Sequence, residues 1–178
     1  MMVKRKEKRQ MKNIDPRELT DNFFEAVGKE WMLVTAGTKE KFNMMTASWG
    51  CIGWLWNKPV AVAFIRPERF THSIIEQQER LTLSFLGDSQ EMRKAYSICG
   101  SKSGRDCDKV KETGLHPVET KGGSMTFEEA RLTLVCRKLY KDTLKEENFI
   151  DKDLTQWYGE KGGYHDVYVL EIEECLVR

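Results

Sequence analysis

The 178-residue chain has little of what several classes of protein require. Its longest uninterrupted apolar run, residues 60–65, is far too short to cross a bilayer. Its three histidines are spread widely, so a histidine-based metal site would need distant segments to come together. Twenty-nine basic residues against 28 acidic ones leave a net charge of +1, which gives no overall field toward nucleic acid or an anionic membrane. We therefore expect a soluble globular protein without a metal, nucleic acid or membrane partner.

Recognisable processing and catalytic signatures are also missing. The five cysteines are an odd number without a C-x-x-C pair, which predicts reduced thiols rather than a disulfide framework or a zinc site. The basic N-terminus lacks the apolar segment of a secretory signal, so we expect a cytoplasmic protein. The motifs G-x-S-x-G, G-x-x-x-x-G-K-[ST], H-E-x-x-H and a strand-turn-helix G-x-G-x-x-G do not occur. The common hydrolase, P-loop, zinc-protease and dinucleotide-binding classes are therefore disfavoured.

The chain divides into a basic tail and one domain. Residues 1–13 are charged and lack periodicity, so we expect a mobile tail and a single domain over residues 14–178. Asp15 as a cap, Pro16 in the first turn and Gly28 as a stop predict a helix at the start of this domain. Runs rich in β-branched and aromatic residues predict strands at 31–36, 42–47, 60–66, 81–86, 131–140 and 167–175.

Helices are few beside these strands. Capping-box patterns predict helix starts at Ser73 and Asp88, and a third helix from about Asp106 to Gly114. Because the strands are not separated by regular crossover helices, a doubly wound parallel sheet is disfavoured. The sequence predicts a mainly β protein, an antiparallel barrel with peripheral α-helices.

Residues 43–50, with the sequence NMMTASWG, form the first unusual segment. A predicted strand ends here in small residues, and Gly53, Trp54 and Trp56 follow. Small side chains let backbone N–H and C=O groups approach the polar edge of a planar heterocycle, while aromatic side chains cover its faces. The alternative is a strand that ends in a wide turn, with the tryptophans in the core.

The second segment, residues 66–73 with the sequence RPERFTHS, points to an anion. It follows an apolar strand and precedes the helix predicted from Ser73. A helix N-terminus offers unpaired N–H donors, Thr71 and Ser73 offer hydroxyls, and Arg66 and Arg69 offer guanidinium groups, so a phosphate monoester would fit. The alternative makes both arginines surface ion-pair partners and Ser73 only a helix cap.

A third segment, residues 100–106 with the sequence GSKSGRD, is rich in glycine, hydroxyls and positive charge. It could form a second anion-binding nest or a flap. A plain loop, in which Gly100 ends one helix and Asp106 caps the next, explains most of the pattern without a ligand.

Taken in order, these segments resemble the flavin reductase-like, FMN-binding split-barrel family, particularly its flavoredoxin-like branch. The resemblance rests on residues 43–50, 58–65, 66–71, 99–109 and 163–165. It implies a six-stranded, Greek-key split barrel that forms a homodimer, with FMN close to the subunit interface. The bulky Cys51, Trp54 and Trp56 depart from the family pattern.

The resemblance also implies the residues of the cofactor site. The edge of the isoalloxazine ring would lie against Met45, Thr46, Ala47, Ser48 and Trp49. The phosphate would be held by Arg66, Arg69 and Thr71. Residues expected to close the site, from the same chain or a neighbouring subunit, are Ser103, Gly104, Asp106, Tyr164 and His165.

Three functions are compatible with this pattern. The leading one is an NAD(P)H-dependent flavin reductase, in which NADH or NADPH reduces the flavin and the chain supplies no catalytic side chain of its own. The second is an electron-transfer protein that keeps its FMN and serves a protein partner. The third is a flavin-free barrel that stacks a ligand or nucleic acid on its tryptophans, which the near-zero net charge disfavours.

Overall fold

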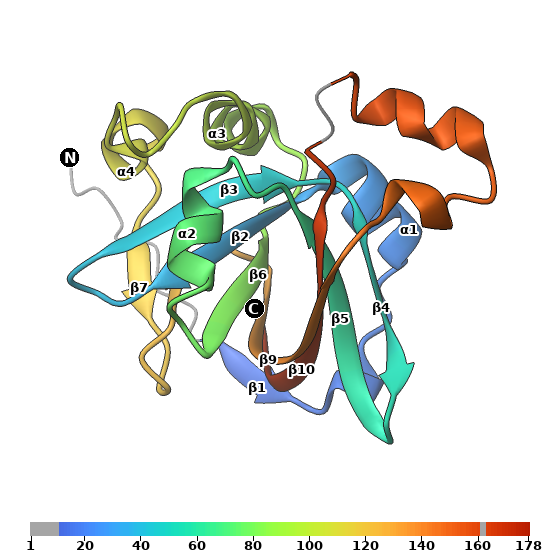
Figure 1. Ribbon diagram of the computed structural model, residues 1–178. Coiled ribbons are helices and arrows are strands. Elements are labelled where there is room, and N and C mark those ends of the chain that lie inside the picture. Colours follow the sequence, from blue (N-terminus) through green and yellow to red (C-terminus); the bar gives the residue numbers. More distant parts are fainter. Residues whose placement is uncertain (1–10, 161–162) are drawn as a thin grey trace, which may run out of the picture.

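The computed structural model describes residues 11–160 and 163–178, and its architecture is mainly β (Figure 1). The strands are β1 (Lys12–Ile14), β2 (Met32–Gly37), β3 (Phe42–Ala47), β4 (Gly50–Leu55), β5 (Lys58–Ile65), β6 (Arg80–Phe85), β7 (Pro117–Glu119), β8 (Met125–Phe127), β9 (Leu132–Thr143) and β10 (Asp166–Val177). The α-helices are α1 (Phe23–Glu25), α2 (Phe70–Ile75), α3 (Gln90–Ser101) and α4 (Lys109–Thr113). Shorter turns are the 3₁₀ helices η1 (Pro16–Glu18), η3 (Glu146–Asn148) and η4 (Lys152–Trp157) and the π-helix η2 (Ala26–Glu30). None of the described helices has the length and apolar character to span a membrane.

Eight strands form one antiparallel sheet in the order β3-β2-β6-β9-β10-β5-β4, with β1 added to β10. Strand β5 lies beside β10, while β6, which follows β5 in the chain, lies two strands further on. This order is a Greek-key arrangement. All six strands predicted from the sequence are present, and the antiparallel pairing is confirmed. The strand count was too low, because β1, β4 and the separate β7–β8 hairpin were missed.

The two ends of the sheet meet at one short connection. Strands β3 and β4 are its two edge strands, yet only Ser48 and Trp49 separate them in the chain. The sheet must therefore curl until its edges come close, which brings β3 near β5 (Figure 1). Backbone hydrogen bonds do not join β3 to β4, so the barrel is split at Ser48 and Trp49.

Two groups of apolar side chains hold the barrel together. Inside the barrel, alternate residues of the strands pack with α2 and with Phe23, and the fully buried residues of this group include Ile65, Leu83 and Tyr168. Outside it, α3 covers β2 and β3, where its Tyr96 packs with Leu33 of β2. Residues alternate between the faces of a strand, so β2 contributes to both groups and is buried along its whole length.

The N-terminal region differs from its prediction. Residues 1–10 of the expected tail lie outside the described residues, but Lys12 and Asn13 belong to β1, which pairs with β10. The expected helix up to Gly28 is wrong. Asp15 caps only the single turn η1, the chain is extended at Leu19, and Gly28 lies inside the π-helix η2. Asn22 then caps the separate helix α1, because its side chain accepts a hydrogen bond from Phe24 N, and Leu19 and Phe23 on either side of this cap pack against the barrel core.

Three other helix boundaries are corrected. Helix α2 begins at Phe70, and Ser73 lies inside it with its hydroxyl donating to Phe70 O. Ser89, not Asp88, caps α3, and this helix runs past Gly100 to Ser101. Asp108, not Asp106, caps α4, while the predicted end at Gly114 is confirmed by its left-handed backbone (φ 72°). Local capping patterns therefore predicted the start of each of these helices to within about one turn, but the residue that caps the helix is a neighbour of the predicted one.

Candidate functional site

Two cavities meet at the split in the barrel. The first, the split cavity, has a volume of about 180 Å³ and is lined by Met45, Thr46, Ala47, Ser48, Trp49, Phe64, Arg66, Arg69 and His165. The second, the loop cavity, has a volume of about 240 Å³ and is lined by Asn43, Glu68, Arg69, Phe70, Thr71, Gly100, Ser101, Lys102, Ser103, Gly104, Arg105 and Lys109. Arg69 lines both, so the two cavities are neighbouring parts of one site.

Aromatic side chains shape the split cavity. The ring of Trp49 lies 5.0 Å from the imidazole of His165 and meets Trp157 edge-on at 5.7 Å. His165 is buried and its Nδ1 shares a 3.1 Å hydrogen bond with the hydroxyl of Tyr158. Burial, aided by the positive charge of Arg66, lowers the pKa of His165 to about 4. The imidazole is therefore neutral at physiological pH and presents a flat, uncharged wall.

Arg66 is held at the split cavity by the segment that carries η4. Its Nη2 atom donates to Trp157 O at 2.8 Å, and its guanidinium carbon lies 5.4 Å from the centre of the Tyr158 ring. Glu68 is a further partner at 3.7 Å. Arg66 thus faces the segment 45–49 rather than the start of α2.

Positive charge concentrates instead in the loop cavity. Arg69 Nη2 and Lys109 Nζ both donate to Cys99 O, at 3.2 and 2.9 Å, and Lys109 also donates to Met44 O at 2.8 Å. Lys109 is only 4% exposed. Within residues 11–160 and 163–178, neither cation has a carboxylate in ion-pair contact.

Burial lowers the pKa of Arg69 and of Lys109. The positive charge of Arg69 lowers the pKa of Lys109 further, while Glu68 raises and Arg66 lowers the pKa of Arg69. Lys109 is buried, Arg69 is half-buried, and neither has a carboxylate in ion-pair contact among the described residues. This is costly, because the protein does not fully replace the hydration that each cation has lost. A bound anion would repay this cost, and a phosphate monoester, with several acceptor oxygens, suits two neighbouring cations.

A close backbone approach completes the loop cavity. Thr71 Oγ1 is buried and accepts a 2.9 Å hydrogen bond from Asn43 Nδ2, which leaves the Thr71 hydroxyl hydrogen to donate elsewhere. A Cβ atom at Gly104 would lie only 2.2 Å from Asn43 Oδ1. Only glycine lets the loop pass this close to Asn43. The cavity therefore offers cations, a hydroxyl and exposed backbone, which fit a phosphate group.

Comparison with known proteins agrees with this arrangement. Residues 24–178 match the family described as Flavin reductase like domain. The chain belongs to the flavin reductase-like family. No curated protein sequence matches it significantly.

Solved structures of the same fold show low sequence identity. An FMN-binding protein from Thermus thermophilus superimposes with a TM-score of 0.66 at 20% identity, over 94% of this chain and 82% of that one. A flavoredoxin from Methanosarcina acetivorans gives 0.62 at 21% identity, over 84% and 68%. Nitrilotriacetate monooxygenase component B from Bacillus cereus gives 0.63 at 16% identity, over 92% and 80%. The split-barrel fold expected from the resemblance is thereby confirmed.

The structure brings most of the predicted site residues of this flavin reductase-like chain together. The five residues of segment 45–49, together with Arg66, Arg69 and His165, line the split cavity, and Arg69, Thr71, Ser103 and Gly104 line the loop cavity. Two predicted residues line neither. Asp106 donates its backbone N–H to Ser103 O, and Tyr164 stacks on Tyr158 with 4.5 Å between ring centres. Their roles as ligands stay predictions.

Sequence reasoning missed Lys109 as a site residue. The lysine stands at the start of α4, directly after its cap Asp108, so its local pattern is that of a helix cap. Its long side chain reaches Met44 O of β3, 65 residues away in the sequence, and the neighbouring residues in the chain do not predict that contact. Ser73, in contrast, was expected to offer a hydroxyl to the anion, but that hydroxyl is engaged inside α2.

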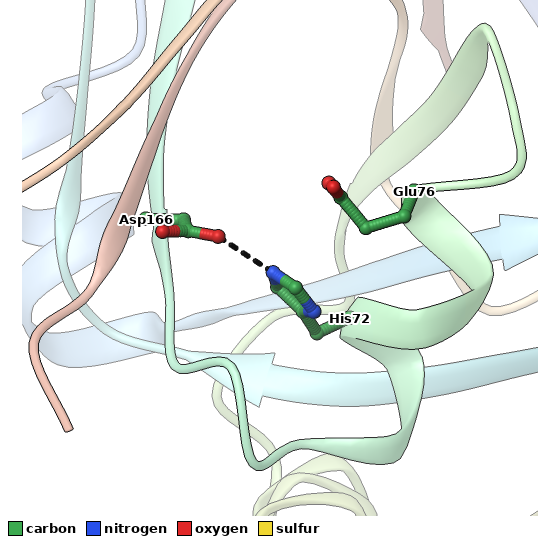
Figure 2. A group of neighbouring side chains, drawn as sticks. All are labelled: His72, Glu76 and Asp166. Atoms are coloured by element: carbon green, nitrogen blue, oxygen red, sulfur yellow. Dashed lines mark hydrogen bonds and ion pairs between the residues drawn. The ribbon is translucent and has the colours of Figure 1, made fainter.

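One other polar group lies near the site. Among the described residues, His72, Glu76 and Asp166 place their ligand atoms within 4.8 Å of one another (Figure 2). His72 Nε2 meets Asp166 Oδ2 at 2.7 Å, and Lys141 Nζ lies 2.7 Å from Glu76 Oε2 and 2.9 Å from Asp166 Oδ2. Although burial raises the pKa of Asp166, hydrogen bonds from Thr143, His72 and Lys141 lower it overall. Because the Lys141 ammonium forms ion pairs with both carboxylates, we interpret the group as a tether between α2 and β10.

Proposed function

We propose that this flavin reductase-like protein binds one FMN, with the isoalloxazine ring at the split cavity and the phosphate in the loop cavity, and passes electrons through it. The observation that carries the proposal is the convergence of Arg69 and Lys109 on Cys99 O, next to the segment 45–49. An FMN-binding protein of known structure from Thermus thermophilus shares the fold and supports the choice of ligand.

The chain's own contribution is binding and electrostatics. Backbone N–H groups around Thr46 to Ser48 would donate to the polar edge of the ring, where negative charge develops on reduction. Trp49 and the neutral His165 would cover part of the ring and exclude water. When bound, FMN supplies the redox chemistry, so no side chain has to act as an acid, base or nucleophile.

The test begins with an absorbance spectrum of the purified protein and a titration of the FMN-free protein with FMN. We expect the two flavin bands and one FMN per chain. The double variant Arg69→Leu/Thr71→Val should weaken FMN binding by at least about tenfold, because it removes a charge-assisted hydrogen bond and a hydroxyl. Unchanged affinity of this variant for FMN would overturn the placement of the phosphate.

We propose that the protein is an NAD(P)H-dependent flavin reductase. The assay mixes the FMN-loaded protein with NADH or NADPH without oxygen and follows the loss of flavin absorbance. Rapid bleaching by either donor supports the reductase. A second candidate is an electron carrier that receives electrons from a protein partner, and the flavoredoxins among the solved structures of this fold favour it. A fully loaded protein that neither NADH nor NADPH bleaches would be such a carrier.

We also propose that the protein forms a homodimer through the exposed end of the β4–β5 hairpin. Trp54 and Trp56 are 57% and 56% exposed, and Leu55 lies between them. Strand β4 is an edge strand, and an apolar edge is a ready contact for another chain. Light scattering of the protein and of Trp54→Lys tests this. We expect a dimer that the substitution converts to a monomer, and a wild-type monomer would refute it.

A further inference from the structure

A third cavity adjoins the split cavity on strand β4. It has a volume of about 400 Å³ and is lined by Phe23, Phe24, Val27, Gly28, Ser48, Trp49, Gly50, Cys51 and Ile52. We name it the β4 cavity. Ser48 and Trp49 line both this cavity and the split cavity, so the two cavities are neighbours.

The lining of the β4 cavity carries no charged side chain. Its larger residues are aromatic or aliphatic, and its polar side-chain groups are the hydroxyl of Ser48 and the thiol of Cys51. The loop cavity, in contrast, is lined by Arg69, Lys109 and other charged residues. A charged ligand would lose its hydration in the β4 cavity without gaining a partner. An uncharged ring would gain contact with aromatic faces.

The cavity is open beside Gly28. Gly28 lies in the π-helix η2, and a Cβ atom placed there would meet nothing within 4 Å. Phe24 on the rim is 92% exposed, and an exposed phenylalanine beside an apolar hollow is a contact left for a ligand. A volume of this size lies within the usual range of small-molecule sites.

We infer that the β4 cavity binds an uncharged aromatic or cyclic small molecule. This ligand would lie against the opposite side of Trp49 and Ser48 from the split cavity. The binding site itself stands on the cavity's shape and lining. Only the statement that the ligand lies beside a bound flavin rests on the proposed function.

The first test uses a matched pair of fluorescent probes on the FMN-free protein. N-phenyl-1-naphthylamine is uncharged, and 1-anilinonaphthalene-8-sulfonate has the same ring system with a sulfonate. We expect one uncharged probe to bind per chain with a rise in emission, and the sulfonate to bind at least about tenfold more weakly. Equal affinity for both probes would overturn the proposal.

Two glycine substitutions locate the probe. Gly28→Phe places a ring in the cavity, whereas Gly53→Phe adds the same ring on β4 outside it, and a Cβ atom meets nothing within 4 Å at either position. We expect Gly28→Phe to weaken probe binding at least about tenfold and Gly53→Phe to change it less than about twofold. Equal effects would place the probe elsewhere. If Gly28→Phe left probe binding intact but turned a dimer into a monomer, a second copy of the chain would be the occupant and the proposal would fail.

A footprint on wild-type protein makes the test independent of folding of the variants. Cys51 is exposed in the cavity wall, whereas Cys107 is half-buried elsewhere. The uncharged probe should slow alkylation of Cys51 by N-ethylmaleimide at least about fivefold, measured by mass spectrometry of peptides, because a bound ligand covers the thiol. Cys107 should react at an unchanged rate. Unprotected Cys51 would overturn the proposal.

Failure of the proposed function would look different. If FMN bound neither the wild-type protein nor Gly28→Phe, the flavin site would be refuted while the probe measurements, made without FMN, still decided on the β4 cavity. If both proteins bound FMN equally and only Gly28→Phe lost the probe, the two sites would be shown to be separate neighbours.

Discussion

Replacing Lys109 by methionine should weaken FMN binding by about 10- to 150-fold. The Lys109 ammonium is 4% exposed and touches two backbone oxygens, Met44 O and Cys99 O, but no carboxylate among the described residues. A bound phosphate would be the natural partner of this charge. A hydrogen bond to a charged group contributes roughly 1.5–3 kcal/mol, and each 1.4 kcal/mol is a factor of about ten in affinity. Methionine keeps approximately the length and the apolar stem of the side chain, and it removes the charge together with the hydrogen bonds to Met44 O and Cys99 O.

The assay compares FMN with riboflavin, which lacks the phosphate. Quenching of flavin fluorescence gives both dissociation constants for the wild type and for Lys109→Met. We expect the affinity for FMN to fall and the affinity for riboflavin to stay within about twofold, since Lys109 does not line the split cavity, where we propose that the ring binds.

Lys111→Met is the matched control for this prediction. Lys111 is on the same helix, but its side chain is 85% exposed and faces Asp108, so its removal should leave FMN binding within about twofold. Equal losses for FMN and riboflavin in Lys109→Met, or a similar loss of FMN affinity in Lys111→Met, would refute the assignment of the phosphate to Lys109.

Four further substitutions test the site and its surroundings. Burial lowers the pKa of His165 from 6.5 to about 4, so the unfolded chain takes up this proton first and stability falls as pH drops through that window. Between pH 7 and pH 4, the free energy of unfolding of His165→Asn, measured in urea, should therefore fall by up to about 3 kcal/mol less than that of the wild type. An equal fall in both proteins would contradict a buried neutral imidazole. Gly104→Ala should destabilise by about 1–3 kcal/mol, because its Cβ would lie 2.2 Å from Asn43 Oδ1. Gly100→Ala is the control: it lies in α3, its added Cβ atom would have its nearest contact at 3.5 Å, and it should stabilise the protein by roughly 0.5–1 kcal/mol. If thermal unfolding showed that both variants change stability in the same direction, that would be evidence against the loop geometry. Lys141→Met should cost about 1–2 kcal/mol in urea unfolding, because its ammonium forms ion pairs with two carboxylates, and no change would show that the tether contributes nothing.

The sequence located the long strands because alternation and β-branched composition are local signals. It missed β4 because Gly50 and Gly53 interrupt the pattern, and because Trp56 and Asn57 make the hairpin turn with positive φ angles, at 51° and 56°. Tryptophan is an unusual residue for such a turn, so turn chemistry gave no warning. The strand is held by pairing with β5, which local propensity does not report.

The candidate site was partly predictable from the sequence. The order of the segments pointed to the ring edge at 45–49 and to an anion near Arg69, and both line the cavities of the structure. The two arginines expected at the phosphate lie differently: Arg66 lines only the split cavity, whereas Arg69 lines both cavities. Arg66 and Arg69 are three residues apart and look equivalent in the sequence, yet Trp157 O holds Arg66 at the split cavity while Arg69 reaches Cys99 O.

By itself, the sequence determined six of the ten described strands, the end of α4 at Gly114, and which segments have the small, polar and basic residues that a phosphorylated planar ligand needs. These properties depend on near neighbours in the chain. Only the tertiary structure decided that β3 and β4 are opposite edges of one sheet that meet at Ser48 and Trp49, and that Lys109 reaches across to Met44 O. The physical reason is that burial and the convergence of charges depend on how distant strands pair, and that pairing is a property of the whole curled sheet.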